Sequence, residues 1–254
     1  MKKTINRILT VLFALIFLIS AFLIARYYIQ SRQAANKYDE FAEQVHEIED
    51  RQDPSGSEEQ EGEVLPQYAS LKKQFPDMVG WIRIDGTVVD YPVAQGENNS
   101  YYLHHAFDGS DSDHGCIFAD KSCDMESPSD NIILYGHHMK DGSMFAVLDQ
   151  YKKKEFWQEH PVIHFDTLTD SADYEILAAF AVSVDTGNEA EFRYYDFIEA
   201  KNKKDFDNYV EECLSRSLYT TGVTAEYGDR ILTLSTCEYS RTNGRMVVVA
   251  RKIS

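Results

Sequence analysis

The stretch that decides the fold lies near the C-terminus and reads Thr233-Leu234-Ser235-Thr236-Cys237, followed by Arg245-Met246-Val247-Val248-Val249-Ala250-Arg251. Both runs are rich in apolar and β-branched residues, which is typical of buried strands. The residues between them, 238–244, end in Asn243-Gly244, a strong signal for a tight turn between paired strands. We therefore predict that the two runs pair as a β-hairpin.

This hairpin would bring a thiol and a guanidinium together. In a hairpin centred near Arg241, Cys237 and Arg245 are cross-strand partners, which lie about 5 Å apart on one face of a sheet. A neighbouring cation stabilises the thiolate, the nucleophilic form of cysteine. Cys237 is therefore a candidate nucleophile, and Arg245 is a candidate for binding an oxyanion. Arg241 is the alternative cation, but an arginine at a loop apex would point to solvent, so we favour Arg245.

A candidate acid and base lies about 100 residues upstream of the cysteine. The run Asn131–Gly136 has the length and composition of a short buried strand and is followed directly by His137 and His138. Nucleophile and base commonly come from distant parts of a sequence and meet only in the folded chain. Because neighbouring residues of a strand face opposite sides, only one of the two histidines can reach Cys237.

Together, TLSTC at 233–237, the arginine eight positions on and YGHH at 135–138 resemble the motifs of class B sortases. These are membrane-anchored cysteine transpeptidases of Gram-positive bacteria, and the resemblance covers roughly residues 66–254. It implies a mainly β fold, an eight-stranded β-barrel with peripheral helices, one of them long and placed between the sixth and seventh strands. It also implies that His137, the histidine directly after the glycine, is catalytic.

The rest of the chain supplies suitable elements. Within 80–93, two short strands are joined at Asp85-Gly86, a hairpin signal. Further short strands are expected at Cys116–Ala119, Asn131–Gly136, Val162–Asp166 and Tyr174–Asp185, and helices at Ser143–Tyr151 and Lys203–Leu218. Many short strands at this spacing predict a barrel or a sandwich. Ser235 would share the face of Cys237 if its strand alternates regularly, which makes it a candidate for lining a peptide groove.

The N-terminus predicts a membrane anchor. Residues 8–25 are uncharged and almost wholly apolar, near the lower limit for a spanning helix. Lys2, Lys3 and Arg7 precede them, which favours a cytoplasmic tail (1–7) and an extracellular catalytic domain. We expect a single-pass protein of the cell membrane. A cleaved signal peptide is the alternative, although no small-x-small cleavage site follows.

A spacer, residues 26–65, would separate the anchor from a catalytic domain at 66–254. Its apolar residues recur at helical spacing and predict a helix that packs on the domain: Ala34, Tyr38, Phe41, Val45 and Ile48. Eleven acidic residues and one basic residue between Asp39 and Glu63 indicate a solvated linker after that helix. The 254 residues carry a net charge of −17, which argues against nucleic-acid binding.

The other cysteines and histidines allow rival interpretations. Cys213 has the setting of a small core residue, whereas Cys116 and Cys123 leave a disulfide open. A zinc site could be built from His104, His105, His114, His137, His138, Cys116 and Cys123, but these seven show none of the CxxC, HxxxH or HExxH spacings. We therefore expect no metal and no cofactor, and we expect His104, His105 and His114 to be polar loop residues.

The resemblance implies a reaction and its partners. Cys237 would cleave a C-terminal sorting signal of a secreted protein after threonine, with signals of the Asn-Pro-x-Thr type favoured in this class. The new carboxyl end would be joined to an amine of a peptidoglycan precursor or cross-bridge, or to a pilin lysine. A secreted cysteine peptidase or amidase with water as acceptor is one alternative. A non-catalytic surface binding module is the other.

Overall fold

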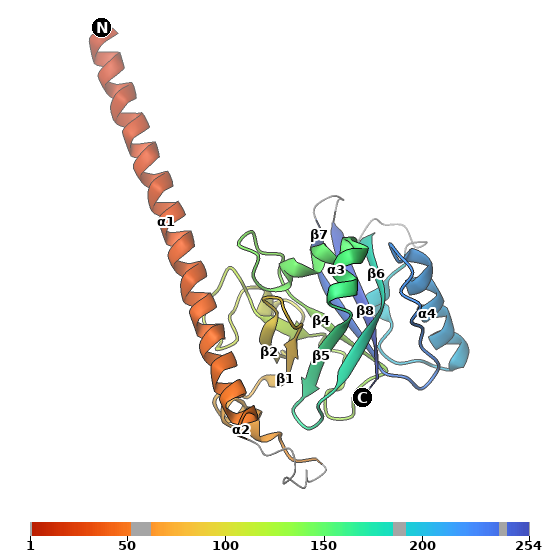
Figure 1. Ribbon diagram of the computed structural model, residues 1–254. Coiled ribbons are helices and arrows are strands. Elements are labelled where there is room, and N and C mark those ends of the chain that lie inside the picture. The colour runs from red at the N-terminus through yellow and green to blue at the C-terminus, as the bar shows by residue number, and fades with distance from the viewer. Residues whose placement is uncertain (1, 52–61, 185–191, 239–242, 254) are drawn as a thin grey trace.

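The computed structural model describes residues 2–51, 62–184, 192–238 and 243–253. Its centre is a closed barrel in the order β1-β2-β3-β4-β7-β8-β6-β5 (Figure 1). The strands are β1 Met78–Arg83, β2 Asp90–Ala94, β3 Ile117–Ala119, β4 Asn131–Tyr135, β5 Val162–Thr167, β6 Asp173–Ser183, β7 Ile231–Glu238 and β8 Gly244–Lys252. The predicted eight-stranded barrel is confirmed, and within the described residues each strand pairs with a neighbour on both sides.

The β7–β8 hairpin forms in the predicted register. Cys237 is the partner of Arg245, and Glu238 is the partner of Gly244. Asn243 adopts φ +50, a left-handed conformation that asparagine tolerates better than most residues. The local turn signal therefore identified the end of the connection, and the hairpin delivers the thiol and the guanidinium to one end of the barrel.

Two of the strand pairs are parallel, β2 with β3 and β4 with β7. The second pair runs in continuous register from Asn131↔Ile231 to Tyr135↔Ser235. A buried polar contact secures this register, because Thr233 Oγ1 donates to Asn131 Oδ1 at 2.8 Å and both residues are fully buried. A slip of one residue would break that bond and turn apolar side chains to the wrong face.

The helices surround the barrel. Helix α4 Lys203–Arg216 lies between β6 and β7 in the sequence, as predicted. The side chain of Asn202 caps its N-terminus, and its apolar face packs against the sheet. The expected helix at 143–151 is a 3₁₀ helix, η2 Phe145–Lys152. Two short helices, α2 Pro66–Gln74 and α3 Lys154–Glu159, were not predicted, because helices of this length show too few turns for a clear period.

The longest element, α1 Lys2–Glu49, extends well beyond the barrel (Figure 1). Its apolar part, Lys3–Arg26, is long enough to cross a membrane and is not buried by the protein. Its second half lies against the barrel, where Tyr38 is 4% exposed and Val45 is 0% exposed. The predicted packing of this helix on the domain is confirmed, and the side chain of Ala34 lies outside the described residues.

A histidine ties the end of α1 to the barrel. His46 Nε2 lies 2.7 Å from Asp90 Oδ2 on β2, and its Nδ1 lies 3.0 Å from Glu49 Oε2. Burial alone would lower the pKa of His46, but hydrogen bonds and charge from the two carboxylates outweigh it and raise that pKa above its ordinary value. The protonated imidazole therefore stabilises the docked helix.

This arrangement predicts a pH-dependent stability. Since the folded pKa of His46 is raised, its contribution is complete below the unfolded pKa of about 6.5 and is lost as the pH rises through the folded value. We expect His46→Gln to lower the melting temperature by about 1–3 °C near pH 5.5 and to have no effect near pH 9. Thermal unfolding of both proteins across this range is the measurement. A difference independent of pH would contradict the role of the charged imidazole.

Candidate active site

Three adjacent strands bring the predicted site residues to one end of the barrel. β7 lies between β4 and β8, and neighbouring strands are spaced about 4.8 Å apart. Arg245 pairs with Cys237 from one side. From the other side, His137 follows the last β4–β7 pair, Tyr135↔Ser235, by two residues, as Cys237 does on its own strand. The thiol therefore lies on the central strand, between the strands that carry the imidazole and the guanidinium.

Gly136 allows β4 to end close against its neighbours. Its N–H donates to the Ser235 carbonyl at 3.2 Å, and its carbonyl accepts from Thr236 Oγ1 at 2.8 Å. A Cβ atom at this position would lie 2.5 Å from Ile117 Cδ1 and 2.8 Å from the ring of Phe145, closer than real Cβ contacts. Any side chain at residue 136 would therefore displace the strand end that carries the histidine.

The two histidines have different surroundings. The Nε2 atom of His137 lies 2.8 Å from the Leu103 carbonyl oxygen. The backbone carbonyl of His137 accepts from the Phe145 N–H at 3.0 Å. His138 forms a β-bridge with Met144 and lines a cavity of about 460 Å³ beside Lys140. The two neighbouring histidines thus have different partners, and the preference for His137 over His138 stays a prediction.

The four cysteines differ in exposure. All are free, so Cys116 and Cys123 form no disulfide, and Cys213 lies in the core as predicted. Burial raises the pKa of the Cys116 thiol, and burial likewise raises the pKa of Cys123 to about 12. Cys237 is the cysteine with partial exposure to solvent. Since the thiolate is the reactive form, the buried thiols are poor nucleophiles and Cys237 is the accessible candidate.

Ser235 lies beneath the surface, and its hydroxyl meets a residue that the sequence did not reveal. It is 1% exposed, and its Oγ lies 2.7 Å from Tyr194 Oη. Burial raises the pKa of Tyr194 to about 12, although the Ser235 bond and the charge of Arg245 both act to lower it. Tyr194 therefore lies within electrostatic reach of the candidate site. It comes from a short 3₁₀ helix, η3 Tyr194–Asp196, where no periodic pattern could single it out.

Arg245 is half-buried, and its Nη1 donates to the Gly244 carbonyl at 2.9 Å. Its strand pairs on the other side with β6, where Val182 is its partner. The strand that carries the guanidinium is thus paired on both edges. Arg241 lies outside the described residues, so the preference for Arg245 over Arg241 stays a prediction.

One histidine of the segment 101–115, His114, differs from its expected setting. His114 is 3% exposed and its Nε2 lies 2.9 Å from Asp141 Oδ2, whereas the sequence suggested an ordinary polar loop residue. A carboxylate partner explains how a polar ring can be buried there. Among the described residues, no group of three or more histidines, cysteines or acids is arranged to hold a metal ion.

A partly exposed thiol lies at the end of a closed barrel, on a strand between those that carry an imidazole and a guanidinium. This arrangement defines a cysteine-dependent acyl-transfer enzyme. Comparison with known proteins agrees. The family model described as Sortase domain matches residues 82–253. Sortase B of Staphylococcus aureus (strain NCTC 8325 / PS 47) is 34% identical over 255 residues, which cover 100% of this chain and 98% of that protein.

Solved structures give the same result. The chain is similar to the Staphylococcus aureus sortase B-substrate complex, with a TM-score of 0.78 and 32% identity over 89% of this chain and 99% of that one. It is also similar to sortase B complexed with triglycine, with a TM-score of 0.77, 32% identity and the same coverage. The chain belongs to the sortase family, within which it is of class B. It is a cysteine transpeptidase that anchors proteins to the cell wall.

The packing around Gly136 predicts the effect of one added methyl group. Gly136→Ala would force the end of β4 away from Ile117 and Phe145. We expect turnover to fall by about 10²-fold, since misplacement by about 1 Å can cost that much. Steady-state kinetics with a sorting-signal peptide is the measurement.

Gly222→Ala is the matched control. Gly222 has φ +83, so alanine is strained there, but nothing lies within 4 Å of the new Cβ. This variant should lose a little stability and keep its turnover. Wild-type turnover in Gly136→Ala would show that the strand end tolerates displacement.

Proposed function

We propose that Cys237 is the nucleophile of the transpeptidation, His137 its general acid and base, and Arg245 the donor that stabilises the oxyanion. The observation that carries this proposal is the strand register. Cys237 pairs with Arg245 on β8, and the β4–β7 ladder leads His137 to the same level on the other side. This register supports a site built from three groups of complementary chemistry on adjacent strands, although the histidine lies 100 positions before the cysteine.

The first half-reaction forms a thioester. The thiolate of Cys237 attacks the carbonyl carbon of a threonine in the sorting signal, and the carbonyl oxygen becomes an oxyanion. Arg245 and backbone N–H groups donate to that oxygen, an interaction worth about 10²–10³ in rate for one donor. His137 protonates the departing amine as the carbon–nitrogen bond breaks. The C-terminal piece of the substrate leaves, and the threonine remains bound to sulfur.

The second half-reaction reverses the roles. An acceptor amine attacks the thioester carbonyl, and His137 removes its proton. The carbon–sulfur bond breaks, which frees the Cys237 thiolate and leaves a new amide. Because the acid and base duties alternate on one imidazole, the same geometry serves both steps.

The comparisons support a choice of substrates. Sortase B of Staphylococcus aureus has been solved as a substrate complex, and a sortase B structure has been solved with triglycine. For this chain, we propose a secreted protein with a C-terminal sorting signal as acyl donor, of the Asn-Pro-x-Thr type. The proposed acceptor is a primary amine of a peptidoglycan precursor or cross-bridge, with a pilin lysine as the alternative.

Ser235 is proposed to act from below the groove. Its buried hydroxyl bonds to Tyr194, so it fixes the strand segment that leads to the thiol. Tyr194 in turn lies near the charge of Arg245. The hydroxyl pair of Ser235 and Tyr194 would support the floor of the peptide groove. Ser235 lies two residues before the nucleophile.

The N-terminal part of α1 is proposed to anchor the enzyme in the cell membrane. The candidate span Lys3–Arg26 contains the apolar residues 8–25, and Lys2, Lys3 and Arg7 precede this apolar run. Positive charge of this kind stays in the cytoplasm, so the barrel would lie outside the cell. Sorting signals of exported proteins would then meet the enzyme at the outer surface of the membrane.

The proposal predicts the products of a two-substrate reaction. Incubated with an Asn-Pro-x-Thr-containing peptide and triglycine, the enzyme should give a peptide cleaved after threonine and extended by triglycine, identified by mass spectrometry. Cys237→Ala should form no product while keeping its melting temperature, since the residue is only partly buried. Cys213→Ala is a control that keeps the reaction, because this core thiol lies on α4.

Two outcomes would contradict the proposal. Product formation by Cys237→Ala would exclude this cysteine as the nucleophile. Hydrolysed peptide that added triglycine does not divert would identify a peptidase with water as acceptor.

The role of Arg245 predicts that charge alone is insufficient. A guanidinium offers a planar fork of donors, whereas a lysine ammonium is a point charge on a flexible stem. We expect Arg245→Lys to lose about 10²–10³ in turnover, as Arg245→Ala does. Arg251→Lys on the same strand is the control and should be near wild type, because Arg251 pairs with Glu175 on β6. Substantial turnover in Arg245→Lys would assign the arginine to thiolate stabilisation only.

A further inference from the structure

The imidazole of His137 is oriented by a backbone carbonyl. Its Nε2 lies 2.8 Å from the Leu103 oxygen. Because a carbonyl can only accept, Nε2 carries the proton of this bond. In the neutral ring, Nδ1 is then the nitrogen left to exchange a proton. The position of Leu103 therefore sets both the tautomer and the orientation of His137.

The segment around Gly115 holds the Leu103 carbonyl in place. The Cys116 N–H donates to the Tyr102 carbonyl at 3.0 Å, which brings the two ends of this loop together. A Cβ atom at Gly115 would lie 3.2 Å from the Leu103 oxygen and 3.2 Å from Cδ2 of His137. The backbone of Gly115 thus packs beside both the Leu103 carbonyl and the His137 ring, and a shift of this backbone would move both.

Helix α1 supplies the side chain that fixes Gly115. Tyr38 is 4% exposed, and its Oη donates to the Gly115 carbonyl at 3.2 Å. Burial raises the pKa of Tyr38 well above its usual range, and a hydrogen bond from the Phe107 backbone lowers it only in part. The hydroxyl therefore stays protonated and remains a donor. The ring packs edge-on against Tyr91, with centroids 5.3 Å apart.

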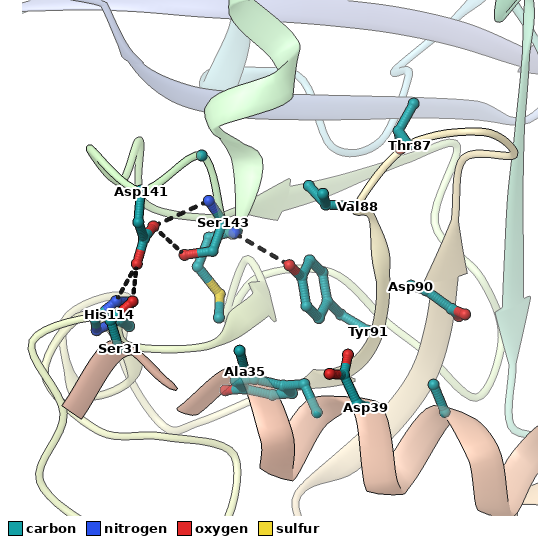
Figure 2. A pocket seen from close by; sticks show the side chains of 14 residues that line it. Ser31, Ala35, Asp39, Thr87, Val88, Asp90, Tyr91, His114, Asp141 and Ser143 are labelled. Carbon is teal, nitrogen blue, oxygen red and sulfur yellow. Dashed lines mark hydrogen bonds and ion pairs between the residues drawn. The ribbon is translucent and has the colours of Figure 1, made fainter. Parts of the chain in front are cut away.

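A second contact from α1 reaches the loop that follows His137. Ser31 donates to the carboxylate of Asp141, which also accepts from Ser143 Oγ at 2.7 Å and pairs with His114 at 2.9 Å (Figure 2). Burial would raise the pKa of Asp141, but these hydrogen bonds outweigh it and keep that pKa well below its usual range. The carboxylate borders a cavity of about 460 Å³ between α1 and the barrel. Helix α1 thus contacts two segments near His137, the one that contains Gly115 and the loop that follows the histidine.

We infer that Tyr38 is a positioning residue for the transpeptidation. Its hydroxyl, through Gly115 and Leu103, holds His137 in the Nε2-protonated tautomer that leaves Nδ1 for proton exchange. This inference rests on the proposed role of His137. It makes the helix that continues from the apolar N-terminal stretch a part of the active-site scaffold, beyond its use as an anchor.

The test uses the full-length enzyme in detergent micelles and Tyr38→Phe, which keeps the ring and removes the hydroxyl. We expect kcat for the peptide and triglycine to fall about fivefold to tenfold, as for the loss of one buried hydrogen bond. KM for the peptide should stay within about twofold, since the ring of His137 acts in the chemical steps. In nitrogen-15 spectra of labelled histidine, the His137 signal should lose its dominant Nε2–H character.

Tyr68→Phe is the matched control. Tyr68 on α2 is 1% exposed, and its hydroxyl bonds to Asp166 on β5 at 2.6 Å. This variant also loses a buried tyrosine hydroxyl between an N-terminal helix and the barrel. Its melting temperature should fall by a similar amount, while kcat and the His137 spectrum stay as in the wild type.

The different failures can be told apart. Turnover retained by His137→Ala would overturn the proposed function itself. A dead His137→Ala with wild-type kcat and spectrum in Tyr38→Phe would overturn this inference alone, as would equal losses of kcat in Tyr38→Phe and Tyr68→Phe. The spectrum of the wild-type enzyme tests the Nε2–H tautomer of His137 without any variant. A dominant Nδ1–H tautomer for His137 would overturn the inference even if Tyr38→Phe does not fold.

Discussion

The parallel pairing of β4 with β7 is the constraint on which the rest of the structure depends. Its register is continuous from Asn131↔Ile231 to Tyr135↔Ser235, and the buried bond between Thr233 and Asn131 secures it. Parallel strands cannot be joined by a tight turn, so this contact closes a loop of about 100 residues, at a cost in chain entropy. Once it forms, an imidazole and a thiol from distant parts of the chain lie at the same end of the barrel.

The elements that hold this end of the barrel come from many parts of the chain. Gly136 lets β4 approach Ile117 and Phe145, and a carbonyl from the 101–115 segment fixes the imidazole. The second half of α1 packs against the barrel and contributes buried side chains to its core. Each part of this end of the barrel is therefore held by a neighbour that is distant in sequence. In this arrangement, the positions of the site residues depend on side chains that do not contact the substrate.

The sequence predicted the parts of the site that depend on local chemistry. The alternation and turn signal after Cys237 sufficed to place Arg245 opposite it, because a hairpin is a local structure. His137 needed the family resemblance, since no local rule specifies a parallel pairing across 100 residues. Tyr194, Leu103 and the buried His114 were missed because they lie in irregular segments, where contacts arise from tertiary packing alone. The short helices α2 and α3 were missed for lack of periodicity.

The central claim is that Cys237 forms the thioester and that His137, rather than His138, serves it. Single-turnover reactions with a sorting-signal peptide and no acceptor, followed by acid quenching and mass spectrometry of the digested enzyme, measure this directly. The account predicts an acyl group on the peptide that contains Cys237, formed at a near-normal rate in His138→Ala and at least about 10²-fold more slowly in His137→Ala. Slow acylation in His138→Ala with normal acylation in His137→Ala, or an acyl group on another residue, would contradict it.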